Sequence, residues 1–381
     1  MIYLDNSATT PLSPSAIEGM RSAIGRFGNP SSTHFMGREA ARIEEETKIA
    51  VLRSLDARIE DHEVIFTSGG TEANNLAVFG TAYAKKRRPP VLVTTDSEHP
   101  CILEPCRRLE GEGFSVVRLK TAGGRIDEEE LKEALNKTPF LLSVMAVNNE
   151  TGAVYGVERI FSEAKALCPG VICHSDAVQA YGKIPLSLRR LKADLLTLSA
   201  HKIHGPKGCG ALVVRRELLK RKDLTARLVG GGQEGGLRSG TQNTVGIAGF
   251  GGAVRNTFAD PARDRARLSA LRAALISSLP GEITVNEAPE SAPHIVSITL
   301  PHIKSETALN FLSGKGICVS NGSACASNGR HKSYVLSAFG LCDKDVDSTL
   351  RVSFSPENTA EEVSALVSAL EEALKTLVRF K

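Results

Sequence analysis

Short β-rich apolar runs alternate with amphipathic helical stretches from residue 63 to about residue 250, and this alternation constrains the fold most strongly. It is typical of an α/β protein in which helices cover a mostly parallel sheet. A different pattern begins near residue 260 and predicts a smaller α+β part, with a helix over 263–279, a strand over 295–300 and a helix over 360–379. The apolar runs of the first part are 64–67, 91–94, 141–144, 171–174 and 193–198.

Charge and cysteine usage exclude several classes of protein. The net charge of +4 arises from 47 basic and 43 acidic residues spread along the chain, so we expect neither direct nucleic-acid binding nor a membrane surface. No apolar run approaches the roughly 20 residues that span a bilayer, and the first residues do not resemble a signal peptide. The eight cysteines form no Cys-x-x-Cys pair, so we expect no metal site and a cytoplasmic protein with reduced, mostly buried thiols.

Lys202 follows the apolar run 193–198, and the turn signal at 205–208 prevents a long helix there. The lysine is therefore expected just past a strand end, between His201 and His204. Partial desolvation there favours attack on an aldehyde to form a Schiff base. An ordinary solvated loop lysine is the alternative.

Other polar residues follow other predicted strands, and ligands of parallel sheets gather at the carboxyl ends of the strands. Gly70 and Thr71 lie where a strand gives way to a helix, which favours phosphate binding, although a plain turn explains them too. Asp176 can keep a ring nitrogen protonated, with Gln179 three residues further on, or it can cap a helix. His99 can stack on an aromatic cofactor or be structural.

Three further residues fit chemistry with an amino acid. Asn149, after the run 140–147, can bind a cofactor or build a turn. Cys325 lies in the polar small-residue segment 319–333, where neighbouring basic residues favour its nucleophilic thiolate over an incidental thiol. Arg351, on a predicted strand, suits a substrate carboxylate or a structural ion pair.

Together these segments resemble the cysteine desulfurases nearly from end to end, starting at Tyr3 and reaching Arg351. The resemblance implies a fold-type I aminotransferase architecture with a seven-stranded sheet, a homodimer, and pyridoxal 5'-phosphate as cofactor. It also implies conversion of L-cysteine to L-alanine, with the sulfur left on an enzyme cysteine as a persulfide. We expect a large cofactor-binding domain over residues 15–257 and a small domain over 1–14 and 258–381.

The resemblance also implies a role for each matching residue. Catalysis is expected from Lys202, which binds the cofactor, from Cys325, which forms the persulfide, and from His99, which stacks on the ring and carries protons. Arg351 is expected to anchor the substrate carboxylate, with Asn149 near cofactor and substrate. The other expected cofactor contacts are Asp176 at the ring nitrogen, Gln179 at the phenolic oxygen, Gly70, Thr71, Ser199 and His201 at the phosphate, and Thr241 at the phosphate of the neighbouring subunit.

The long segment around Cys325 is similar to that of the first of the family's two groups, which passes sulfur to scaffold proteins or tRNA-thiolation enzymes. The sequence departs from the family's pattern at 232–236 and 355–358, and we expect these departures to affect the dimer rim or the partner surface. Three alternatives remain open at this point. They are a selenocysteine lyase, another aminotransferase-fold enzyme, and a non-catalytic sulfur-scaffold or metal-binding protein that uses His201, His204 and Cys209.

Overall fold

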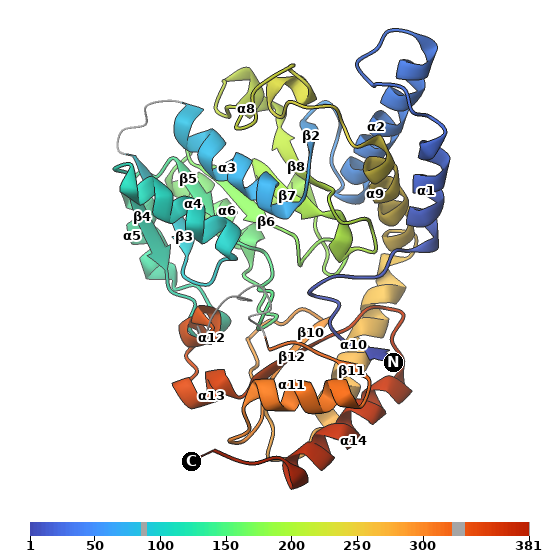
Figure 1. The fold of residues 1–381 in the computed structure, drawn as a ribbon. Helices are drawn as coiled ribbons and strands as arrows, with labels where there is room; N and C mark the ends of the chain where they lie inside the picture. The colour runs from blue at the N-terminus through green and yellow to red at the C-terminus, as the bar shows by residue number, and fades with distance from the viewer. Residues whose placement is uncertain (85–89, 322–331, 381) are drawn as a thin grey trace.

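The computed structural model describes residues 1–84, 90–321 and 332–380. Its largest element is a seven-stranded sheet (Figure 1). Only β8 runs antiparallel to its neighbours, β2 and β7, and the other adjacent pairs are parallel, so the predicted α/β class with a mostly parallel sheet is confirmed. In spatial order the strands are β2 (His62–Thr67), β8 (Gly210–Arg215), β7 (Leu195–Ser199), β6 (Ile172–Asp176), β5 (Leu141–Ser143), β3 (Val91–Thr95) and β4 (Ser115–Leu119).

Helices cover both faces of this sheet, because successive strand side chains point to opposite sides and both sides are apolar. Leu195 and Leu212 pack on the side of α3 and α4, whereas Leu196 and Val213 pack on the side of α6 and α9. The helices of this part are α1 (Pro14–Ile24), α2 (Phe35–Ser54), α3 (Gly70–Ala84), α4 (Pro100–Gly111), α5 (Glu128–Asn136), α6 (Val157–Leu167), α7 (Leu188–Leu191), α8 (Arg216–Lys220) and α9 (Thr244–Thr257), with 3-10 turns η1 (Ala122–Gly124), η2 (Ala200–Lys202) and η3 (Glu234–Gly236).

The remaining chain forms a smaller α+β part with a hydrophobic core of its own, in the lower half of Figure 1. Its antiparallel sheet has the order β12 (Thr349–Ser353), β10 (Ile295–Thr299), β9 (Thr284–Val285). A second, parallel pair joins β1 (Ile2–Tyr3) to β11 (Ile317–Cys318). The helices are α10 (Pro261–Ser278), α11 (Ser305–Gly314), α12 (Tyr334–Phe339), α13 (Asp343–Asp347) and α14 (Ala360–Thr376).

The N-terminal segment touches both parts of the molecule. Leu4 is buried in the core of the smaller part, whereas the backbone N–H groups of Thr10 and Ser13 donate to carbonyls of His201 and His204 beside β7. This arrangement is compatible with the boundaries expected at 14/15 and 257/258, which stay a prediction.

The strand predicted over 140–147 is shorter in the structure, where β5 covers only Leu141–Ser143. Beyond its end, the backbone N–H groups of Val144 and Ala146 still donate hydrogen bonds to carbonyls of β6. The predicted loop around Cys325 falls largely on residues outside the described part of the chain. Within the described residues, no helix is both long and apolar enough to cross a membrane.

Candidate active site

A cavity of about 520 Å³ opens where β6 and β7 end and where the smaller part meets the large sheet. We call it the active-site cavity. It is lined by the predicted residues Gly70, Thr71, His99, Asn149, Asp176, Gln179, Ser199, His201, Lys202 and Arg351. Residues from distant points of the sequence thus meet at one place, as expected for the carboxyl edge of a parallel sheet.

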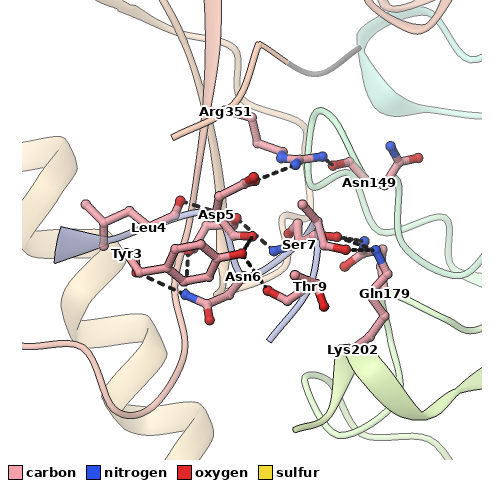
Figure 2. A network of polar contacts seen from close by, with 12 residues as sticks. Tyr3, Leu4, Asp5, Asn6, Ser7, Thr9, Asn149, Gln179, Lys202 and Arg351 are labelled. Atoms are coloured by element: carbon pink, nitrogen blue, oxygen red, sulfur yellow. Dashed lines mark hydrogen bonds and ion pairs between the residues drawn. The ribbon is translucent and has the colours of Figure 1, made fainter. Parts of the chain in front are cut away.

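Lys202 ends η2, the short turn that directly follows β7. Its Nζ donates to the backbone carbonyls of Ser7 and Ala8, the latter at 2.8 Å. Gln179 Nε2 donates to the same Ser7 carbonyl at 2.9 Å, and Figure 2 shows both side chains reaching the N-terminal segment. The lysine is therefore held by neutral oxygens inside the cavity and is not an ordinary solvated loop residue.

Asp176 is the last residue of β6, and its buried carboxylate has two donors. Asn74 Nδ2 donates to one oxygen at 2.6 Å, and the backbone N–H of Val178 donates to the other at 2.9 Å. The second bond caps a turn. The alternative that Asp176 caps a helix is therefore wrong, because a turn and not a helix follows it in the described structure. A carboxylate held in this way suits a protonated ring nitrogen.

His99 is the N-cap of α4, which fixes the imidazole in the cavity wall. Its Nδ1 accepts from the backbone N–H of Cys101 at 3.2 Å and lies 2.8 Å from the Cys101 thiol. The neutral ring consequently carries its proton on Nε2. Burial lowers the pKa of His99, the Asp176 carboxylate opposes this shift, and the Lys202 ammonium adds to it.

The part of the cavity wall formed by Gly70, Thr71 and Ser199 suits a phosphate. Gly70 and Thr71 open α3, where backbone N–H groups lack helical partners. A side chain at Gly70 would approach a Val178 methyl to 2.9 Å, so any larger residue there would have to displace Val178. Ser199 Oγ is buried without a partner among the described residues. Burial, assisted by Lys202 and Lys207, lowers the pKa of the nearby His201 to about 4, which leaves a neutral imidazole.

Arg351 projects from β12 of the smaller part and is almost fully buried. One guanidinium nitrogen pairs with Asp5 at 2.7 Å, and a second donates to the Asn149 carbonyl at 2.8 Å (Figure 2). Its Nε and the side-chain oxygen of Asn149 are both buried without a partner in the described part of the chain. The site thus combines the structural ion pair with a free donor for a carboxylate at Arg351 Nε, and Asn149 adds a free acceptor that suits an amine.

Several residues of this site were missed from sequence. Asn74 and Cys101 line the cavity and link Asp176 to His99, since Asn74 Nδ2 also contacts the Cys101 sulfur at 2.9 Å. Glu98, next to His99, is fully buried, and burial raises its pKa to about 8. A single polar residue inside a helix or beside a motif gives no sequence signal for such a role, and backbone carbonyls such as that of Ser7 give none at all.

Of the last two predicted site residues, only Thr241 belongs to the described part of the chain, and it does not line the cavity. Thr241 is exposed in the loop between η3 and α9, and Cys325 lies outside the described residues. The metal-binding alternative finds no support, because within 1–84, 90–321 and 332–380 no group of three or more His, Cys, Asp or Glu side chains is arranged to hold an ion.

Comparison with known proteins agrees with this geometry. The family model described as aminotransferase class-V matches residues 2–366. Cysteine desulfurase IscS of Proteus mirabilis (strain HI4320) is 40% identical over 386 residues, which cover 99% of this chain and 93% of that protein. The same enzyme of Serratia proteamaculans (strain 568) is 38% identical with the same coverage.

Solved structures agree over the whole length. A NifS-like protein matches with a TM-score of 0.91 at 34% identity, over 99% of this chain and 100% of that chain. The X-ray structure of a NifS-like protein from Rickettsia africae ESF-5 matches with a TM-score of 0.88 at 28% identity, over the same shares of both chains. The chain therefore belongs to the aminotransferase class-V family and, within it, to the cysteine desulfurases.

Proposed function

We propose that this protein is a cysteine desulfurase in which L-cysteine and the thiol of Cys325 give L-alanine and a persulfide on Cys325. The observation that carries the proposal is the convergence of Lys202, Asp176 and Arg351 in one cavity. A nucleophilic amine, a carboxylate for a ring nitrogen and a carboxylate anchor are the groups that amino-acid chemistry at a pyridine ring requires.

The residues present fit pyridoxal 5'-phosphate. The unpartnered Ser199 hydroxyl, the glycine at position 70 and the start of α3 would hold its phosphate. Lys202 would hold its aldehyde carbon, and Asp176 would face its ring nitrogen. When bound, the cofactor supplies an electron sink next to the substrate amine.

The chain's own groups then perform the positioning and the proton transfers. Arg351 binds the substrate carboxylate, while Asp5 and the Asn149 carbonyl fix the orientation of its guanidinium group. Lys202 Nζ removes the proton from the substrate α-carbon, and His99 carries protons by taking one up on its neutral ring and passing it to the leaving product. The Cys325 thiolate attacks the substrate sulfur, and the carbon–sulfur bond breaks as the sulfur–sulfur bond forms.

The assembly and the sulfur acceptor belong to the same proposal. Thr241 is exposed and lies away from this chain's own cavity, as needed if it reaches the phosphate of a second subunit in a homodimer. We further propose that the persulfide passes to an iron-sulfur scaffold protein or a tRNA-thiolation enzyme in the cytoplasm.

The test compares Cys325→Ser with Cys342→Ser, the same change at an exposed thiol that contacts Asp345 outside the cavity. Both proteins are loaded with pyridoxal 5'-phosphate and given L-cysteine. We expect Cys325→Ser to keep the cofactor absorbance and to lose persulfide and alanine formation, whereas Cys342→Ser keeps all three. Undiminished persulfide in Cys325→Ser would overturn the assignment.

A further inference from the structure

A second and larger cavity, of about 1000 Å³, lies between the large sheet and α10. We call it the α10 cavity. Its walls come from the start of α6, from the segment 183–187 after β6, from the loop 290–293 and from α10 itself. In the described part of the chain it shares no lining residue with the active-site cavity, so the function proposed above does not account for it.

Lys183 is the most unusual residue of this cavity. The residue is only 5% exposed, its side chain lines the cavity, and its ammonium group has no ion-pair partner among the described residues. The nearest carboxylate influence comes from Asp264, which instead pairs with Arg263 at 2.9 Å. Burial lowers the pKa of Lys183 to about 8. A buried cation without a counter-charge is costly, so this amine favours an anion in the cavity.

The wall that α10 contributes to the cavity carries two further cations. Arg265, Ser269 and Arg272 follow one another at helical spacing on one face of α10, and all three line the cavity. Arg272 donates to Glu287 through one nitrogen at 2.8 Å, but its buried Nε has no partner in the described residues. Arg265 forms no hydrogen bond or ion pair with any described residue. Donors for an anion therefore line the same cavity as Lys183.

Acidic residues do not neutralise these walls. Glu158 and Glu290 also line the cavity, but both side chains are exposed at its rim. Glu158 pairs with Arg190, and the lining residue Arg159 pairs with Glu128 outside the cavity. The buried part of the cavity consequently keeps an excess of positive charge.

We propose that the α10 cavity binds a small anion whose phosphate or carboxylate oxygens contact Lys183, Arg265 and Arg272. Guanidinium groups match the geometry of phosphate and carboxylate oxygens. The volume suits a small metabolite, since ligand pockets span roughly 300–1,000 Å³. Phosphorylated and polycarboxylate metabolites share this chemistry, and the experiment distinguishes them.

Such a ligand would connect the two parts of the molecule, because Lys183 follows β6 of the large sheet whereas α10 belongs to the smaller part. The fully buried His294 is influenced by cationic side chains of both cavities. Burial lowers the pKa of His294, and Lys183 lowers it further together with Arg351 and Lys202 of the active-site cavity. An anion in the α10 cavity is therefore positioned to stabilise the relative placement of the two parts behind the active site.

The test titrates orthophosphate and citrate separately into the cofactor-loaded, full-length protein by isothermal titration calorimetry. We expect saturable binding of at least one probe. The double variant Arg265→Gln/Arg272→Gln should weaken it by about 100-fold or more, since the charge-assisted hydrogen bonds of two guanidinium groups are lost. Binding of phosphate alone would assign a phosphorylated ligand, and binding of citrate alone a polycarboxylate.

Arg267→Gln is the matched control, because Arg267 lies on the same helix, donates to the Asn358 carbonyl and does not line the cavity. It should bind the probe as the wild type does. Arg351→Gln should also keep the binding, which separates this site from the active-site cavity. Each probe should raise the thermal midpoint of the wild type but not that of the double variant. Absence of saturable binding, equal affinity in the double variant and in Arg267→Gln, or loss of binding only in Arg351→Gln would overturn the proposal.

Discussion

Lys202 in the active-site cavity and Lys183 in the α10 cavity are lysines with opposite surroundings. The Lys202 amine is held by carbonyl oxygens of the N-terminal segment, in a cavity where Asp176 and Asp5 also provide negative charge. Lys183 is buried without an ion-pair partner among the described residues, in a cavity that two arginines also line. In the active-site cavity, acidic side chains thus offset the positive charges. In the α10 cavity, positive charge remains that an anionic ligand can neutralise.

The largest expected effect separates the two lysines by activity. Lys202→Ala should reduce alanine formation from L-cysteine at least about 1,000-fold, because the group that holds the cofactor and moves the proton is lost. It should also change the visible absorbance of the cofactor. Lys183→Met should retain both alanine formation and absorbance. Comparable losses in the two variants would remove the distinction between the cavities.

The ion pair of the active-site cavity is the next test. Arg351→Gln should lower kcat/KM for L-cysteine by about 100-fold, mainly through a higher KM, because the charged donors for the substrate carboxylate are removed. Asp5→Asn should have a smaller effect in the same direction, since Asp5 acts by orienting Arg351. Steady-state kinetics measure both. An unchanged KM in Arg351→Gln would contradict the anchor role.

Glu98 provides a pH test beside the active-site cavity. Its pKa is raised from an ordinary value of 4.5 to about 8, so the folded protein keeps a proton that the unfolded chain has released. Stability should therefore fall as pH rises from about 4.5 through 8. Glu98→Gln should reduce this fall by about 2 kcal/mol between pH 6 and 8, measured by urea unfolding. A pH dependence equal to that of the wild type would refute the buried, protonated state.

The smallest effect concerns Lys183. Its pKa is lowered from 10.5 to about 8, so the unfolded state binds more protons between these values and wild-type stability should rise across that range. Lys183→Met should remove this rise and stabilise the anion-free protein at pH 7 by about 1 kcal/mol, because a buried unpaired charge is removed. Urea unfolding at pH 7 and pH 10 measures both. Destabilisation at pH 7 would show that Lys183 has a favourable partner within the fold.

Much of this molecule was predictable from sequence. The alternation of apolar runs and helices indicated the sheet, and polar residues after β6 and β7 marked Asp176 and Lys202. The α10 cavity was not predictable, because Lys183 and Arg272 look like ordinary surface cations until the fold buries Lys183 and the Nε atom of Arg272 in the lining of one cavity. The Asp5–Arg351 pair was missed for a related reason, since it joins the two ends of the chain. Thr241 stays a prediction, because its expected contact requires a second subunit.

The most direct test of the central claim is a single turnover with L-cysteine, followed by mass spectrometry of the cofactor-loaded protein and measurement of alanine. We expect one alanine for each active site and a gain of one sulfur atom on the peptide that contains Cys325. Alanine formed without added sulfur on that peptide, or added sulfur on a different cysteine, would contradict the claim.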